Sequence, residues 1–426
     1  MIQSLSIKNF LSFKDEVTIS FEATKDTHLE DVHVVTVAEG VRLNKLGIIY
    51  GYNASGKSNL IEAFQFLRNF WFDLVGDKDE EIGVIPFMLD HDSRNNPSEF
   101  KLIFYHKGKK YAYYLSVNDN VVLKEKLDFY PGVQPATIFD RSYKEGLSVI
   151  NFGNKIKVSP VVKDELTIKC LPNTSVFAAL NQLNVNINEL NAVSSWMKVH
   201  VMQSIEPLTR LQEFTESLLI ESDEFKNQVL KYLQKADFNI SKINSSEVEQ
   251  EVSDDFIARA KEITKLPKHE IERLEKHHTI KLSQTEFKHS VKIGEKELSF
   301  PLDFRFQSDG TKRVFGLSGA IFKAIEDNAF LSIDEIEAKL HPRLIEYVLE
   351  QFLRKSGQAQ LLVATHYDNL FDEDDLFRKD NFWFTEKGED GATRLYPLSG
   401  FTGLSRISSF QKAYKYGRFG AVPNID

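Results

Sequence analysis

The chain has 426 residues, of which 42% are hydrophobic and 27% charged, an ordinary globular composition long enough for two or three domains. Its net charge of −9 and isoelectric point of about 5.8 exclude a global basic field that attracts nucleic acid, although they are compatible with a local basic patch. The single cysteine, Cys170, excludes an intrachain disulfide framework, and with no leader pattern or apolar run of about 20 residues we expect a soluble cytoplasmic protein without a membrane partner.

Strand patterns open the chain. Apolar residues alternate with polar ones over residues 2–10 and 17–21, which predicts two strands around a turn at residues 12–15. Residues 32–37 predict a further short strand within a polar stretch.

A phosphate-binding loop follows at residues 51–58, where GYNASGKS fits the pattern G-x-x-x-x-G-K-[ST]. The apolar residues 46–50 predict a buried strand before it, and residues 59–67 predict an amphipathic helix after it. A chance glycine turn is the alternative, but this motif requires the strand and helix that flank it. We expect Lys57 to reach the β- and γ-phosphates of ATP and the Ser58 hydroxyl to bind Mg²⁺. The expected nucleotide-binding residues are Gly51, Asn53, Ala54, Ser55, Gly56, Lys57, Ser58 and Asn59.

The middle of the chain changes from strand to helix patterns. Residues 100–105 and 111–117 predict a hairpin, and residues 121–129 a further strand. The lysines of the hairpin turn could contact phosphates, although a solvated tip is the commoner explanation. Residues 174–285 are predicted to be mainly helical, and residues 279–306 return to strand patterns, with short strands predicted at 279–282, 286–289 and 298–300.

Two carboxylates end the apolar strand predicted at residues 329–333. A buried strand that ends in Asp334 and Glu335 is costly without a cation nearby. We expect Asp334 to hold Mg²⁺ and Glu335 to polarise the attacking water as a catalytic residue. The alternative is a pair of acids that simply reach solvent.

The apolar run at residues 361–365 predicts another buried strand, which ends in His366. A histidine there could contact the γ-phosphate or the attacking water, and its place one strand after the acidic pair favours that catalytic role over a structural one.

A turn at residues 306–313 enters an apolar helix. Ser308 and the N–H groups near Gly310 form a second candidate phosphate site at a helix start. The alternative is an ordinary N-cap.

These motifs, in this order and spacing, resemble the ATP-binding-cassette class of ATPases. The chain looks like the chromosome-maintenance and DNA-repair branch of that class, and most like compact bacterial AAA-type ATPases of the abortive-infection and overcoming-lysogenization-defect groups. Gln65 is a poor candidate for the lid glutamine of the class. The stretches that carry the resemblance are residues 7–13 (opening strand), 308–311 (signature motif), 336–342 (D-loop), 365–366 (switch histidine), 380–387 and 416–423.

The resemblance implies a fold of the α/β class: an ABC-type P-loop ATPase head with a mixed β-sheet lobe and an inserted helical subdomain. The expected boundaries are 1–170 for the first part of the head, 171–285 for the insertion and 286–426 for the rest. It also implies a head-to-tail homodimer, or a higher oligomer, that sandwiches ATP. In such a dimer Ser308 of one subunit caps the γ-phosphate held by Lys57 of the other.

Three functions follow from this resemblance. The first is a Mg²⁺-dependent ATPase that acts as sensor or scaffold of a bacterial anti-phage system with a separate effector, a nuclease or toxin. The second is an ATP-gated clamp on DNA in repair or maintenance. The third, a transporter ATPase, is disfavoured by the Ser-Asp-Gly-Thr signature and the β-rich region 84–150.

Overall fold

A computed structural model describes residues 1–235, 239–263 and 268–423. The chain divides into two compact units. Unit 1 comprises residues 1–208, 323–338 and 348–426, and unit 2 comprises residues 209–322 and 339–347. These limits differ from the expected boundaries. Unit 2 begins at residue 209, whereas the insertion was expected to begin at residue 171, and unit 2 also includes residues 339–347.

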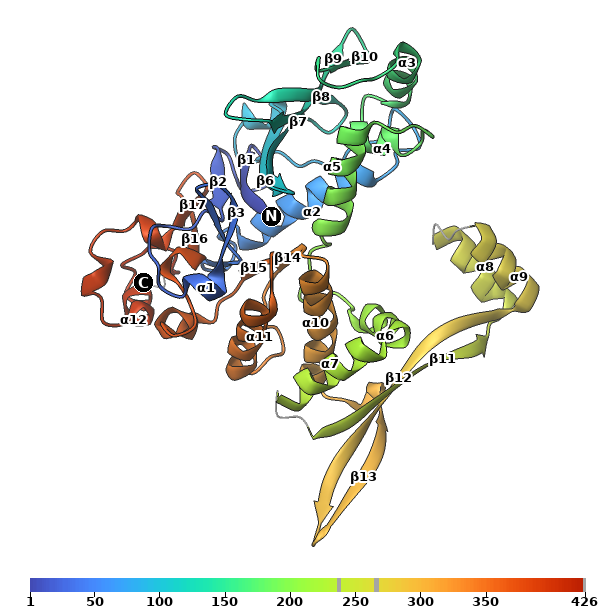
Figure 1. Ribbon diagram of the computed structural model, residues 1–426, viewed down its shortest axis with the longest axis vertical. Coiled ribbons are helices and arrows are strands. Elements are labelled where there is room, and N and C mark those ends of the chain that lie inside the picture. The colour runs from blue at the N-terminus through green and yellow to red at the C-terminus, as the bar shows by residue number, and fades with distance from the viewer. Residues whose placement is uncertain (236–238, 264–267, 424–426) are drawn as a thin grey trace. The chain divides into compact units, whose positions relative to one another are not determined.

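Figure 1 labels most of the helices and strands of the described residues. The strands are β1 (Ile2–Lys8), β2 (Val17–Ser20), β3 (Val34–Ala38), β4 (Val41–Asn44), β5 (Leu46–Tyr50), β6 (Ser98–His106), β7 (Lys109–Val117), β8 (Val122–Tyr130), β9 (Ala136–Lys144), β10 (Leu147–Phe152), β11 (Ile240–Glu251), β12 (Thr279–Ile293), β13 (Lys296–Asp303), β14 (Phe330–Ile333), β15 (Gln360–Ala364), β16 (Phe382–Lys387) and β17 (Thr393–Pro397). The helices are α1 (Glu30–His33), α2 (Lys57–Phe72), α3 (Pro160–Lys169), α4 (Val176–Leu180), α5 (Asn188–His200), α6 (Gln212–Glu221), α7 (Asp223–Lys235), α8 (Asp254–Ile263), α9 (Lys268–His277), α10 (Asp309–Glu326), α11 (Pro342–Lys355) and α12 (Phe410–Lys415).

The central sheet of unit 1 has the strand order β14-β15-β5-β16-β17. β5 pairs in parallel with both β15 and β16, and β14 pairs in parallel with β15, whereas β17 pairs antiparallel with β16. Every residue of β5, β14 and β15 is buried, as expected for parallel strands covered on both faces. Because the carboxyl ends of parallel strands meet at one edge, the segments after β5, β14 and β15 converge there.

The second sheet of unit 1 is antiparallel, with the order β10-β9-β8-β7-β6-β1-β2. Helix α2, which follows the phosphate-binding loop, shares one hydrophobic core with this sheet. Aromatic rings join the two, with centroids 5.0 Å apart for Phe66 and Phe100 and 5.6 Å apart for Trp71 and Tyr113. The middle and end of α2 therefore pack on the antiparallel sheet, while the loop before the helix leaves β5 of the central sheet.

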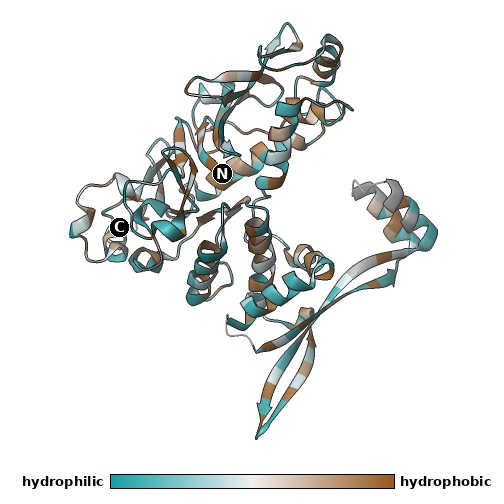
Figure 2. Ribbon diagram, viewed as in Figure 1, coloured by the Kyte–Doolittle hydropathy of each residue, from teal (hydrophilic) through white to brown (hydrophobic). Residues whose placement is uncertain are grey.

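Unit 2 combines helices with a three-stranded antiparallel sheet of order β11-β12-β13. The part of the β12–β13 hairpin beyond the pair Ser290–Ser299 alternates apolar and polar residues, visible as alternating brown and teal in Figure 2. Every residue from Val291 to Leu302 is exposed, including Phe300 at 48%. This distal hairpin therefore has an apolar face that nothing within the chain covers among the described residues.

Most predicted elements are present, with three differences. Residues 32–37 were predicted as one strand, but α1 occupies residues 30–33 and β3 begins at Val34. Strand β11 lies inside the stretch predicted to be mainly helical. Two short strands predicted within residues 279–289 are parts of the single strand β12.

Candidate nucleotide site

The phosphate-binding loop runs from the end of β5 to the start of α2, and its glycines are sterically required. A Cβ atom at Gly51 would lie 2.3 Å from Ser55 Oγ and 2.4 Å from Thr385 Oγ1. Gly56 caps α2 with a φ of 110°, a conformation that L side chains rarely adopt. The backbone of the loop thus packs too closely against its neighbours to leave room for side chains at Gly51 and Gly56. The first N–H groups of α2 follow the loop directly, and such groups at a helix start favour a bound anion.

Lys57 is the first residue of α2, and its side chain is 6% exposed. Its ammonium donates to the carbonyl oxygens of Gly51 at 2.8 Å and Tyr52 at 3.3 Å. Burial lowers the pKa of Lys57, while the nearby carboxylates of Asp334, Glu337 and Glu335 act in the opposite direction. Lys57 therefore lies within electrostatic reach of the acids that follow β14. Ser58, next on the helix, is exposed, as are Asn53 and Ala54 of the loop.

Hydroxyl groups from three distant segments hold the loop. Ser12 Oγ accepts from Asn59 Nδ2 at 2.7 Å and from Thr393 Oγ1 at 2.8 Å. Thr393 Oγ1 also lies 2.8 Å from the Ser55 carbonyl oxygen, and Ser55 Oγ lies 2.7 Å from Thr385 Oγ1. The turn after β1 and the β16–β17 hairpin thus fix the loop, a support that the sequence analysis did not identify.

The acidic pair leaves β14 at the carboxyl edge of the central sheet. Asp334 is 7% exposed, whereas Glu335 is exposed and has a φ of 46°. The Glu335 N–H donates to Asp334 Oδ1 at 3.1 Å, and the Ile336 N–H donates to the Ala364 carbonyl at 3.1 Å. A left-handed backbone at a non-glycine residue is strained, and such strain concentrates at functional sites. The turn directs the two carboxylates differently.

His366 follows β15, the strand between β14 and β5. Its backbone N–H donates to Glu337 Oε1 at 2.6 Å, which ties it to the loop after the acidic pair. Partial desolvation, followed by the Lys57 charge, lowers the pKa of His366 below its ordinary value of 6.5. A lowered pKa favours the neutral imidazole, which can accept a hydrogen bond. The sequence analysis named Glu337 only as part of the stretch 336–342 that resembles the D-loop and did not identify this contact.

An additional segment lies beside β14. Val201 and Ile205 form parallel bridges with Phe330 and Ile333, and the Asp334 N–H donates to the Ile205 carbonyl at 2.8 Å. Glu206 is therefore next to Asp334 at the carboxyl edge.

Glu206 also lies near Glu62 on α2, whose pKa is raised by burial and by the Glu206 charge. Gln65 is occupied elsewhere, because its Oε1 accepts from the Ser204 N–H at 2.7 Å. The apolar and polar residues of 201–205 do not alternate, so no sequence pattern indicated these two isolated bridges to β14.

Ser308 and Gly310 belong to unit 2. The Thr311 N–H donates to Ser308 Oγ at 3.1 Å, so Ser308 N-caps α10, which is the alternative considered in the sequence analysis. Gly310 follows in the first turn of that helix. We call Ser308, Asp309 and Gly310 the signature turn.

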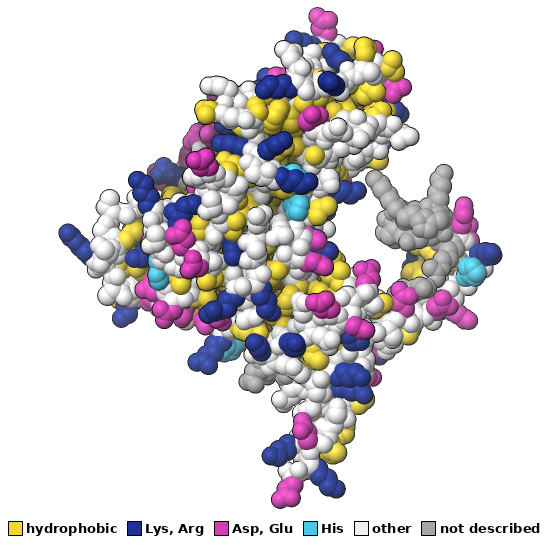
Figure 3. Space-filling model, in the orientation of Figure 1, with side chains coloured by type: hydrophobic (Ala, Val, Ile, Leu, Met, Phe, Trp, Pro, Cys, Tyr) yellow, Lys and Arg dark blue, Asp and Glu magenta, His cyan; other side chains and the backbone are white. Residues whose placement is uncertain are grey.

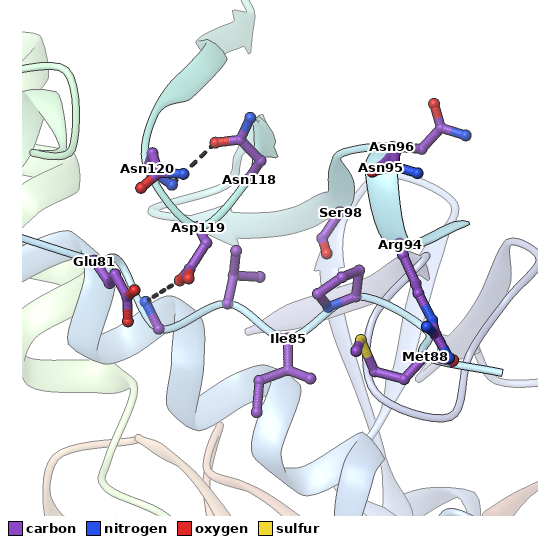
Figure 4. A pocket seen from close by; sticks show the side chains of 13 residues that line it. Glu81, Ile85, Met88, Arg94, Asn95, Asn96, Ser98, Asn118, Asp119 and Asn120 are labelled. Carbon is purple, nitrogen blue, oxygen red and sulfur yellow. Dashed lines mark hydrogen bonds between the residues drawn. The ribbon is translucent and has the colours of Figure 1, made fainter. Parts of the chain in front are cut away.

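Two cavities lie in unit 1 near residues 82–89. One, of about 220 Å³, is lined by Ser12, Asn59 and Lys387 together with mostly apolar residues, and Asn59 follows the phosphate-binding loop directly. The other, of about 680 Å³, is shown in Figure 4. Asn118, Asp119 and Asn120 of the β7–β8 turn line one side, and Arg94 lines another. The larger cavity contains none of the predicted site residues.

The residues present fit a Mg²⁺–nucleotide complex. Gly51 and Gly56 form a cradle that a Cβ atom would fill, and α2 presents its N–H groups there. The exposed Ser58 hydroxyl and the Asp334 carboxylate offer the oxygen ligands that Mg²⁺ prefers.

A strand, a glycine loop and a helix, followed by strands that end in an acidic pair and a histidine, define P-loop ATPases of the ABC and AAA type. The model of one family, described as "AAA domain, putative AbiEii toxin, Type IV TA system", matches residues 48–152 and 198–372. The chain belongs to this family. The matched stretches contain Lys57, Asp334 and His366. The expected fold class, an ABC-type ATPase head with a β-sheet lobe and an insertion, is confirmed, and the insertion contains a sheet in addition to helices.

Solved structures of SMC heads are similar to the chain at low identity. One is the SMC head domain from Thermotoga maritima, with 13% identity, a TM-score of 0.40 and coverage of 93% of this chain and 98% of that chain. Another is an SMC head bound to the C-winged helix domain of ScpA, with 13% identity, a TM-score of 0.42 and coverage of 97% and 99%. A third is the Smc head with an extended coiled coil bound to the C-terminal domain of ScpA derived from Pyrococcus furiosus, with 14% identity, a TM-score of 0.38 and coverage of 98% of both chains. No curated protein matches the chain.

Proposed function

We propose that the protein is a Mg²⁺-dependent ATPase whose heads pair head-to-tail around ATP, and that it acts as the sensor or scaffold of an anti-phage system. The observation that carries the enzymatic part is the convergence of Lys57, the acidic pair and His366. They follow β5, β14 and β15, which are parallel strands of one sheet, with β15 between the other two. The family description, which names a toxin and a toxin–antitoxin system, supports the defence role and a separate effector protein, a nuclease or toxin.

Each residue has a role in this proposal. Lys57 exchanges the loop carbonyls for phosphate oxygens, and Ser58 and Asp334 hold Mg²⁺, which neutralises phosphate charge. Glu335 takes a proton from the attacking water, and neutral His366 orients the water or the γ-phosphate. Glu206, which follows the bridge residue Ile205, would add a further carboxylate near Asp334.

The signature turn completes the site in trans. Ser308 and Gly310 of one copy cap the γ-phosphate that Lys57 of the other copy holds. This assignment gives both phosphate-binding elements of the chain a ligand, and it makes ATP the bridge of the dimer.

A clamp on DNA is less well supported. On the open face of the antiparallel sheet, lysines are paired with acids: Lys8 Nζ lies 3.3 Å from Glu99 and Lys126 Nζ lies 2.7 Å from Asp128. Figure 3 shows basic and acidic side chains intermingled over the visible face. DNA binding relies on unpaired basic groups that displace counterions.

The test compares two site variants with two surface variants. Lys57→Ala should abolish ATP binding and turnover, and Glu335→Gln should lower kcat by about 10²–10⁴-fold, as loss of a general base does. Glu335→Gln with ATP should also accumulate dimers, measured by light scattering at several protein concentrations. The controls are Lys144→Ala and Glu145→Gln in the exposed β9–β10 turn. Turnover that survives Lys57→Ala would refute the proposal.

A further inference from the structure

An ion pair joins the signature turn to the loop that follows the acidic pair. Asp309 Oδ2 lies 3.1 Å from Lys339 Nζ, and both residues belong to unit 2. The backbones also meet, because a Cβ atom at Gly310 would lie 3.1 Å from the Lys339 carbonyl oxygen. Lys339 has a φ of 64°, so the loop turns sharply at this residue. Two features, one ionic and one steric, thus connect Lys339 with the signature turn.

The pair does not serve stability. The Lys339 and Asp309 side chains are 51% and 66% exposed, and ion pairs at such exposure contribute little to folding. Its importance lies in the position of Asp309, the first residue of α10, between Ser308 and Gly310. A carboxylate is favourable at a helix N-terminus by itself, but it repels any second anion that approaches the same N–H groups.

We propose that Lys339 is a positioning residue that cancels the Asp309 charge, so that the signature turn accepts the γ-phosphate held by a second copy. The inference rests on the proposed function, since it concerns the same turn. It explains why the acidic residue Asp309 is compatible with phosphate binding by its neighbours Ser308 and Gly310. Lys339 also lies four residues after Glu335 in the same loop. In the proposed dimer, the loop with the Glu335 of one nucleotide site therefore also holds the signature turn that caps the second nucleotide site.

The experiment is a double-mutant cycle on ATP-dependent turnover and association of the full chain. Lys339→Ala leaves Asp309 uncompensated and should raise both the KM for ATP and the protein concentration for half-maximal association roughly tenfold, as one like charge near a surface does. The value of kcat at saturating ATP and protein should stay within about twofold, because the water-activating residues are untouched. Asp309→Asn alone should have a small effect, and Asp309→Asn with Lys339→Ala should restore both constants to within about threefold of the parent.

Three further arms make the result decisive. Lys339→Arg should behave like the parent, and the Lys339→Ala defect should shrink as salt is raised. Arg354→Ala, which breaks the exposed pair with Glu350, should change nothing. A double variant as weak as Lys339→Ala overturns the inference, because a purely structural contact gives no rescue. If Lys57→Ala keeps its turnover, the proposed function fails first and the inference fails with it.

Discussion

At the residue scale, Gly51 offers a sharp test of the loop. Gly51→Ala places a methyl group 2.3 Å from Ser55 Oγ and 2.6 Å from the Thr385 carbonyl, which the backbone cannot accommodate without moving. We expect the free energy of unfolding, measured in urea, to fall by about 1–3 kcal/mol, and we expect nucleotide binding to weaken. Gly132→Ala is the control, since nothing lies within 4 Å of its Cβ position, and it should change stability by less than about 0.5 kcal/mol. Equal behaviour of both variants would contradict the packing described for the loop.

His366 supplies a pH prediction at the same scale. Its pKa lies below 6.5 in the folded protein, so the folded state binds fewer protons than the unfolded chain as pH falls below 6.5, and stability is lost in that direction. For activity, we expect the acid limb of kcat/KM, which reports the free enzyme, to lie below pH 6.5. His366→Gln should lower activity and remove that limb. An acid limb above pH 6.5 that persists in His366→Gln would exclude this role.

Single residues were predictable where a motif fixes their spacing. Lys57, Ser58, Asp334 and His366 follow buried strands in patterns that need no knowledge of the fold. Ser12 and Thr393 were not predictable, because they meet the loop only through tertiary structure and are 381 positions apart. Glu337 resembled an ordinary loop acid until its bond to the His366 backbone was located.

At the element scale, the distal β12–β13 hairpin should be dispensable for stability. Its residues 291–298 can be replaced by Asn-Gly, a two-residue turn that joins Ser290 to Ser299. Because both faces of this segment are exposed, the free energy of unfolding should change by less than about 1 kcal/mol, measured in urea. Phe287→Ala on the buried part of the same strand should cost about 3–5 kcal/mol. A large loss on excision would show that the apolar face is covered in solution.

Elements were predictable when their apolar pattern was regular. β5, β14, β15 and α2 have uninterrupted patterns, and each was located within a few residues. β11 was missed because Ile240, Ile243 and Val248 do not alternate, and charged residues fill its second half. Its strand conformation comes from pairing with β12 rather than from local preference.

At the scale of the whole molecule, the sequence could not predict the boundaries of the two units. Unit 2 includes residues 339–347, which follow a stretch of unit 1. No change in composition marks this return of the chain to unit 2.

Within the described residues, no helix is both long and apolar enough to cross a bilayer. The proposed cap in trans needs a second chain, and the sequence indicated it only through the resemblance to the ATP-binding-cassette class.

The strands of the central sheet are synthesised at widely separated times, because neighbours in the sheet are far apart in the sequence. The Asn381 side chain donates to the Leu46 carbonyl across 335 residues, and β5 has β15 and β16 as its neighbours. At 5–20 residues per second, a ribosome needs about 20–70 s between making β5 and making β16. During most of that interval the wholly buried β5 has neither of its neighbouring strands, whereas α2 already has the antiparallel sheet to pack on. The parallel strands that support the candidate nucleotide site are therefore all present only after β16, near residue 387, has been made.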